Sequence, residues 1–190
     1  VGASKPRFDF VTDVAGDSGP ERVLIHERDV VVFGKGFREG TSYAFITAGV
    51  ASPKDILDAT ARDLTGDGKA EIILRAVLHA KASKELGGDT VDRHALFVYS
   101  VQGDKLVRIF AAETGRALGK DQVLGAVAFE PDKRGYAIEL RPARAVGWNE
   151  KTYPFPPDTT TAGGLEPLLL PWGDQATRRY RFNGSAFTLE

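Results

Sequence analysis

Residues 63–71 read DLTGDGKAE and residues 13–21 read DVAGDSGPE, so Asp, Gly, Asp and Glu recur at the same relative places, 50 positions apart (63 − 13 = 50). Each copy ends one β-rich run and begins another, because VLI follows the first copy at 23–25 and IIL follows the second copy at 72–74. A repeat of about 50 residues with about four strands per unit is typical of propeller blades. The pattern therefore predicts blade-like β repeats.

Outward from these two copies, the chain is expected to form short strands joined by tight turns. Glycine (21) and proline (10) lie between short β-rich runs. Gln102-Gly103-Asp104 and Asn183-Gly184 are typical of hairpin turns. Helix signals are confined to short turns at 52–55 and 80–86. We expect strands at 7–12, 22–26, 29–33, 42–47, 59–63, 70–78, 95–101, 106–111, 123–129, 136–140, 178–182 and 186–189.

These runs form about three repeat units, 7–50, 57–112 and 121–190, within a single β-rich domain that spans residues 1–190. The third unit has a degraded turn at 129–135, in which Arg134 replaces the second aspartate and would repel a cation. Three blades do not close a propeller, which usually has about four to eight. The expected fold is therefore all-β, with four-stranded antiparallel blade-like units in a partial or propeller-like architecture. Further blades of a longer chain or a second chain could complete it, or the units could form a sandwich.

The spacing of the repeated loop suits a hard cation, because calcium takes about six to eight oxygen ligands. Acidic side chains alternate along the second copy, and Gly68 supplies a sharp turn at its sixth position. The alternative is that both loops are simply tight turns rich in Asp and Gly. The candidate ligands are Asp63, Thr65, Asp67, Lys69 (through its carbonyl oxygen) and Glu71, with a weaker second set of Asp13, Asp17, Gly19 and Glu21.

The second copy resembles the FG-GAP/VCBS-type repeat of integrin-like β-propellers, in which an acidic Asp-Gly loop precedes a hydrophobic strand. The resemblance covers 63–74 well and 13–25 less well. It departs from the family pattern at Thr65 and at Glu71, and in the first copy at Ala15 and Ser18. The resemblance implies structural Ca²⁺ in the loop, a four-stranded blade and an extracytoplasmic location, whether secreted, periplasmic or at the cell surface.

Composition excludes several other classes of protein. The 190 residues carry 25 Lys and Arg against 26 Asp and Glu, and a net charge of −1 gives no reason to expect nucleic acid as a partner. Cysteine is absent, which excludes disulfides and Cys-based metal sites. No apolar run approaches the ~20 residues of a membrane-spanning helix. The first residue is Val1, so we expect a processed chain or a piece of a longer one.

Residues 147–174 stand apart as a long loop rich in proline and aromatic residues. Proline at this density disfavours both helices and strand ladders. The candidate binding residues of this loop are Trp148, Tyr153, Phe155 and Trp172, because exposed aromatic side chains are common binding anchors. The alternative, which we favour, is that the two tryptophans fold back and cover the core.

Catalytic signals are weak. Asp92 lies two residues before His94, which suits acid–base chemistry, but the sequence has no Gly-x-Ser-x-Gly elbow and no His-Glu-x-x-His motif. We therefore expect a non-catalytic, calcium-stabilised binding or scaffold domain that contacts a protein or a glycan. The alternatives are a hydrolase or enzyme accessory domain that uses His94 and Asp92, and a structural subunit of a larger assembly. A sizeable apolar edge on the isolated domain would favour an assembly subunit.

Overall fold

The computed structural model describes residues 5–35, 37–86, 90–156 and 164–190. This part of the chain is all-β, as expected, and each of the twelve predicted runs overlaps one of its strands. None of its helical segments is long and apolar enough to cross a membrane. The strands are β1 (Phe8–Thr12), β2 (Glu21–His26), β3 (Asp29–Phe33), β4 (Tyr43–Thr47), β5 (Ile56–Arg62), β6 (Glu71–Lys81), β7 (Thr90–Gln102), β8 (Lys105–Leu118), β9 (Asp121–Pro131), β10 (Tyr136–Val146), β11 (Arg178–Phe182) and β12 (Phe187–Leu189).

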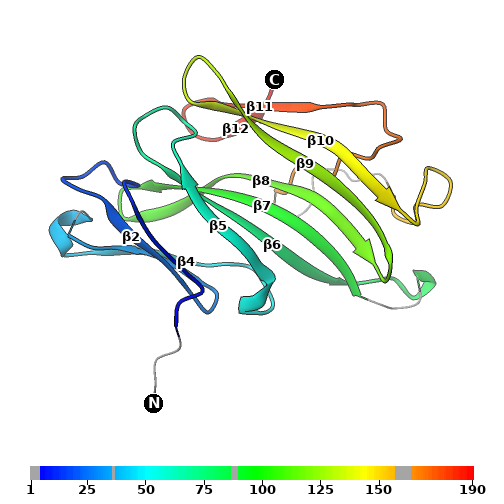
Figure 1. Ribbon diagram of the computed structural model, residues 1–190, viewed down its shortest axis with the longest axis horizontal. Coiled ribbons are helices and arrows are strands. Elements are labelled where there is room, and N and C mark those ends of the chain that lie inside the picture. Colours follow the sequence, from blue (N-terminus) through cyan, green and yellow to red (C-terminus); the bar gives the residue numbers. More distant parts are fainter. Residues whose placement is uncertain (1–4, 36, 87–89, 157–163) are drawn as a thin grey trace.

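The strands form two antiparallel sheets in which sequence neighbours are also spatial neighbours. β1 to β4 make a four-stranded sheet and β5 to β12 make an eight-stranded sheet. Figure 1 shows the blue four-stranded sheet beside one end of the long strands β6 to β8, while β9 to β12 lie on the other side of those strands. Three short 3₁₀ segments, η1 (Arg38–Gly40), η2 (Pro53–Asp55) and η3 (Lys84–Leu86), interrupt the connections.

The second and third expected units are joined, which the sequence did not predict. β8 and β9 pair only near their shared hairpin, from Gly115–Leu124 to Leu118–Asp121, so the sheet continues across the boundary between the units. β6 to β10 are also longer than their predicted runs, because the apolar pattern stops before the strands do. Neither sheet closes on itself, and a propeller is not shown.

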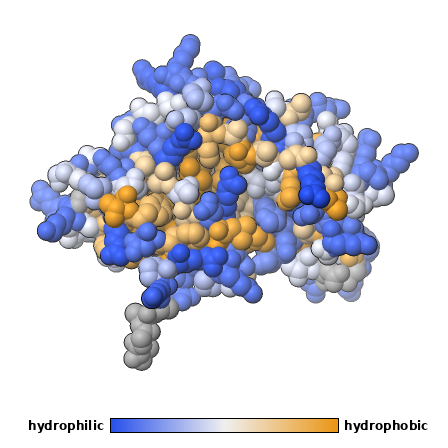
Figure 2. All heavy atoms as spheres, in the orientation of Figure 1, coloured by the Kyte–Doolittle hydropathy of each residue, from blue (hydrophilic) through white to orange (hydrophobic). Residues whose placement is uncertain are grey.

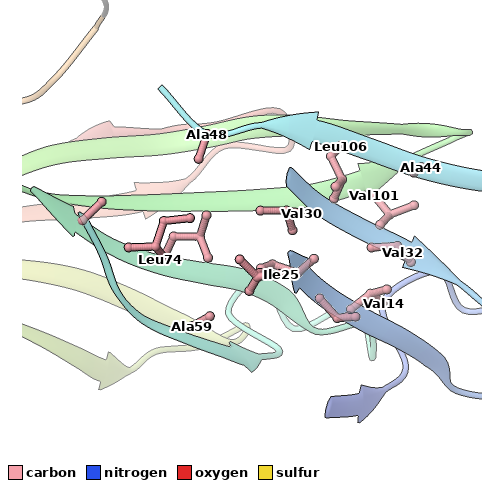
Figure 3. Packing of buried hydrophobic residues seen from close by; sticks show 14 of the residues in the cluster. Val14, Ile25, Val30, Val32, Ala44, Ala48, Ala59, Leu74, Val101 and Leu106 are labelled. Carbon is pink, nitrogen blue, oxygen red and sulfur yellow. The ribbon is translucent and has the colours of Figure 1, made fainter. Parts of the chain in front are cut away.

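The first core lies between the four-stranded sheet and one face of β5 and β6. Val23, Ile25, Val30 and Val32 alternate with outward residues along β2 and β3, and all four are fully buried. Figure 3 shows Ile25, Val30 and Val32 directed toward the side that holds Leu74. Burial of each such side chain contributes about 1.5–3 kcal/mol, so this contact joins the two sheets.

The second core lies on the opposite face of β6 to β8. Ile73, Leu96 and Val98 belong to this core, and they pack in one cluster with Ile138 and Tyr180 of the β9 to β12 half. The Tyr180 ring meets Phe110 edge to face, with ring centroids 5.0 Å apart. β6 to β8 are therefore a central layer with apolar residues on both faces.

The turns after β1, β5 and β9 lie side by side. The Ala70 N–H donates to the Asp13 carbonyl at 2.7 Å, and the Tyr136 N–H donates to the Leu64 carbonyl at 2.8 Å. Gly66 and Gly135 both have positive φ, and a Cβ added at Gly135 would lie 2.2 Å from the Leu64 oxygen. The third turn therefore fits against the second only because a glycine stands at position 135.

We expect Gly135→Ala to destabilise the fold by roughly 3 kcal/mol or more, because a positive φ and a backbone clash act together. Gly103→Ala is the matched control, since Gly103 also has positive φ but has open space around it. That control should lose only about 1–2 kcal/mol. Urea unfolding measures both values, and equal losses would contradict the close approach of the two turns.

Candidate functional site

The carboxylates of the second turn bind the turn's own backbone. Asp63 Oδ1 accepts the Gly66 N–H at 2.7 Å, and its Oδ2 accepts the Gly68 N–H at 2.9 Å. Glu71 Oε2 accepts the Leu64 and Thr65 N–H groups at 2.8 and 3.2 Å. The Asp63 and Glu71 side chains thus cap a turn in which Leu64 is buried.

The first turn repeats this arrangement. Glu21 Oε2 accepts the Val14 and Ala15 N–H groups at 2.8 and 3.0 Å, and Asp13 Oδ1 accepts the Gly16 N–H at 2.8 Å. Val14 is buried where the second copy has Leu64. Asp17 turns away from the loop and pairs with the Arg38 guanidinium at 3.0 Å. Gly19 has no side chain and lies in open space.

These contacts do not fit the calcium ligand set that the resemblance implies. Asp67 Oδ1 accepts the Lys69 N–H at 2.9 Å and its Oδ2 meets the Lys69 ammonium at 3.0 Å, so a cation of the chain already sits on this carboxylate. Across the described ranges, no three His, Cys, Asp or Glu side chains are placed to hold a metal ion together. Calcium in either loop is implied by the resemblance alone, the contacts of Asp67 argue against it, and a direct measurement decides between the two.

We expect the thermal midpoint to be the same in millimolar calcium and in excess chelator, because the carboxylates already have backbone and Lys69 partners. Ligand linkage contributes about 2.7 kcal/mol at 100 times the dissociation constant, which is several degrees in the midpoint. A midpoint that rises in calcium, and no longer rises in Asp67→Asn, would establish the metal site. Asp17→Asn makes the same change in the first loop, and it shows whether a rise in the midpoint depends on that loop instead.

Glu71 is a buried acidic residue. Burial raises its pKa to about 7, the two backbone N–H donors oppose this shift, and the charges of Asp67 and Asp63 add to it. The side chain is 1% exposed. The Thr65 hydroxyl lies 3.3 Å from Glu71 Oε1, so the second oxygen also has a partner. The pKa of Glu71 therefore makes the turn sensitive to pH.

We expect the free energy of unfolding to fall as the pH rises from about 4.5 to 7. The folded state holds a proton on Glu71 in this window while the unfolded state has lost it, so a rising pH favours unfolding. The full effect is on the order of 3 kcal/mol. Glu71→Gln, which stays neutral, should remove this part of the slope. The free energy of unfolding is measured by urea titration at several pH values in this range. If it falls equally in the wild type and in Glu71→Gln, the pKa of Glu71 is not raised in the folded state.

The aromatic residues of the long loop pack on one another. The Trp148 ring meets Tyr153 and Phe155 edge to face at 5.4 and 5.6 Å, and Tyr153 meets Trp172 at 5.5 Å. Trp148 is 9% exposed and packs with Val123 and Leu168. The tryptophans thus fold back, as the favoured expectation has it, but onto a small separate cluster with Val123 of β9 and not onto either of the two cores. Residues 157–163 of the same loop lie outside the described residues.

The structure pairs Asp92 with His79. His79 Nδ1 lies 2.7 Å from Asp92 Oδ1, and its Nε2 lies 3.2 Å from Asp55 Oδ1. Hydrogen bonding to Asp55 and then to Asp92 raises the pKa of His79. His94 lies on β7 over Gly115, where a Cβ would approach within 3.3 Å. His79, which contacts both carboxylates, thus links η2 to β6 and β7. The Asp92 carboxylate pairs with His79 and not with His94.

The outward face of the four-stranded sheet combines exposed apolar side chains with a few charged ones. The register places Val11, Arg22, Phe33 and Tyr43 in one row across the sheet, and Asp9, Leu24, Val31 and Phe45 in the next. Val11, Tyr43 and Phe45 are 64%, 61% and 56% exposed. Figure 2 shows hydrophobic atoms at the surface over the part of the molecule that holds β2 and β4. We call this surface the outer apolar face, and it comprises Val11, Leu24, Val31, Phe33, Tyr43 and Phe45.

The outward face at the opposite end, on β9 to β12, is charged. Arg181 contacts Asp132 at 2.7 Å and Glu190 at 2.8 Å, and Arg179 contacts Glu190 at 3.0 Å. The Glu139 carboxylate lies between Arg141 and Arg179 and accepts a hydrogen bond from each of them. The two ends of the molecule therefore present opposite chemistry.

Sequence reasoning missed the outer apolar face. The signal was present, because residues 23–25, 30–33 and 43–46 carry apolar side chains at consecutive positions and so on both faces of their strands. Strands that are apolar on both faces are typical of sheets covered on both sides. Only one side of this sheet is covered within the described residues.

Comparison with protein-family models, with curated proteins and with solved structures finds no match for this chain. The resemblance to FG-GAP/VCBS-type repeats therefore rests on the residues of the two turns, and it stays a prediction.

Proposed function

We propose that this chain is a non-catalytic scaffold and binding unit of an extracytoplasmic protein, built from blade-like β repeats, that associates through its outer apolar face. One observation carries the proposal. Side chains that belong in a core, such as Phe45 and Tyr43, are more than half exposed together on one sheet face. Contiguous apolar patches on a protein surface commonly mark contact sites. The exposed apolar side chains lie on a sheet face and not on the sheet edge expected of an assembly subunit, and they support the same kind of role.

The internal repeat supports this assignment. The offset of 50 that relates Asp13 to Asp63 places Leu24 at the position of Leu74. Leu74 is 1% exposed because the four-stranded sheet covers it, whereas Leu24 faces outward. The first unit therefore exposes the face that the second unit buries against a neighbouring sheet. A protein surface with a similar apolar sheet satisfies this face better than a polyhydroxylated glycan does.

The occupant is a second copy of this chain, bound back to back. Head-to-tail stacking would bring the outer apolar face against the ion pairs of Arg179 and Arg181, and burial of such ion pairs carries a large desolvation penalty. Back-to-back pairing also buries an ion pair, that of Arg22 with Asp9 at 2.6 Å, but the outer apolar face carries this one pair where the β9 to β12 face carries several. Two-fold pairing of identical patches is the commonest form of association.

The expected dimer is weak. Four strands about 4.8 Å apart and five residues long give the face a footprint of roughly 300 Å². Stable interfaces bury about 800 Å² per partner. We therefore expect an equilibrium between monomer and dimer at micromolar to millimolar protein.

Sedimentation velocity at concentrations from micromolar to millimolar tests the proposal. We expect the wild-type chain to shift toward a dimer as its concentration rises, and Phe45→Lys to weaken dimerisation by tenfold or more, because a charge is placed in an apolar contact.

Leu57→Lys is the matched control, since Leu57 is 47% exposed on β5, outside the face. It should dimerise like the wild type. A wild-type chain that remains monomeric at all concentrations would overturn the proposal, as would equal losses in the two variants.

A further inference from the structure

The four-stranded sheet covers only part of the long sheet beneath it. β1 to β4 have five or six residues each, whereas β6 to β8 have 11 to 14. Leu78 and Phe97 lie on the face of the first core and are only partly buried against it. Further along this face, Leu165 of the segment before β11 packs on Ala95 and Ala111. Two separate elements therefore cover the face, and a gap is left between them.

This gap is a hollow of about 230 Å³, which we call the inner pocket. Ala48 and Gly49, which follow β4, line one side of it, and Leu165 lines another. Its floor is formed by β5 and β6. The floor residues are apolar and at most 2% exposed, and they are Ile56, Leu74 and Ala76.

Two aromatic side chains stand side by side in the lining of the inner pocket. Phe97 and Tyr99 lie next to each other along β7, with ring centroids 6.4 Å apart and planes tilted by 32°. Burial raises the pKa of Tyr99, so its phenol stays uncharged at neutral pH. The lining thus offers ring faces and methyl groups, which are typical of sites for small molecules.

The two arginines that line the inner pocket are already engaged within the chain. Arg93 Nε–H donates to Glu113 Oε2 at 2.9 Å, and Glu113 is 1% exposed. Arg108 also has an interaction partner in the chain, and a Cβ added at Gly164 would lie 3.4 Å from its Nη2. An anionic ligand would therefore lose its hydration without gaining an unpaired cation. The pocket favours a neutral ligand for this reason.

The volume of the inner pocket limits its ligand to a compact molecule. An apolar cavity of roughly 150 Å³ holds benzene, whereas sites for drug-sized molecules begin at about 300 Å³. A volume of about 230 Å³ lies between these limits and suits a small ring system. Water is held poorly over such a floor, because a buried water needs about two to four polar partners. Displacement of poorly held water by an apolar group strengthens binding.

We propose that the inner pocket binds a compact, neutral aromatic molecule, held by contacts with Phe97, Tyr99 and Leu165. A sugar of similar size fits less well, because its hydroxyl groups would face an apolar floor without hydrogen-bond partners. The pocket lies on the inner side of the four-stranded sheet. The proposal is thus separate from the association through the outer apolar face and does not depend on it.

A titration with indole, followed through the backbone amide signals of the ¹⁵N-labelled chain by NMR, tests this proposal. We expect saturable shifts at Gly49, Ala76 and Leu78, with a dissociation constant of roughly 0.1–1 mM for so small a ligand. The signals of β11 and β12, which pack in the second core, should not move. Indole-3-carboxylate, which has the same rings and a negative charge, should bind at least about tenfold more weakly. myo-Inositol should cause no saturable shifts.

Matched variants test the location of the site. Gly49 and Gly19 both leave open space around an added Cβ, and neither has a φ in the left-handed region, so both should accept leucine. Gly49 lines the pocket, whereas Gly19 lies in the turn after β1. Gly49→Leu should fill the hollow and abolish the indole shifts, and Gly19→Leu should bind like the wild type. Phe97→Leu, which removes one ring and stays apolar, should weaken indole about tenfold.

Three results would overturn the proposal. The first is indole binding that survives in Gly49→Leu, and the second is an equal loss in Gly49→Leu and Gly19→Leu. The third is tighter binding of indole-3-carboxylate than of indole, which would assign the pocket to anions. If Gly49→Leu does not fold, as its thermal midpoint would reveal, the effect of Phe97→Leu and the comparison of the two indoles decide the question.

Discussion

The packing of the three turns depends on one contact, the buried Glu71 carboxylate against the N–H groups of Leu64 and Thr65. This contact fixes the turn after β5. The fixed turn then donates a backbone hydrogen bond to the turn after β1 and accepts one from the turn after β9. Its Ala70 N–H reaches Asp13, and its Leu64 carbonyl receives the Tyr136 N–H. A buried carboxylate that accepts two backbone donors thus aligns the first strands of all three units, and with them the two hydrophobic cores.

The two copies of the turn satisfy this carboxylate unequally. Glu71 Oε1 has the Thr65 hydroxyl near it, whereas Glu21 Oε1 is buried and has no hydrogen-bond partner among the described residues. The difference follows from one position, because the first copy has Ala15 where the second has Thr65. A buried polar atom without a partner costs roughly 1–3 kcal/mol. The first turn is therefore the less stable of the two, although their backbones are held in the same way.

Local features of this fold follow from the sequence, whereas its long-range features do not. The hairpins at Gly103 and Asn183 and all twelve strands have short-range signals in glycine placement and alternation. The Asp and Glu spacing at 63–71 was recognised, but it suits a metal loop and a self-capped turn equally well. The direction of the Asp67 side chain, toward Lys69, favours the self-capped turn, and the spacing does not reveal this direction.

The two outward sheet faces differ in chemistry, so the two ends of the molecule are not equivalent. In stacked repeats, a terminal unit needs a polar outer face to remain soluble. β9 to β12 meet this need with the ion pairs of Glu139, Arg179 and Arg181, but β1 to β4 present Tyr43 and Phe45. The sheet face at the C-terminal end is thus charged, whereas the sheet face at the N-terminal end carries the apolar side chains on which the proposed association rests. Since the apolar layers already alternate through two cores, the proposed contact at β1 to β4 would continue the same packing rule outside the chain.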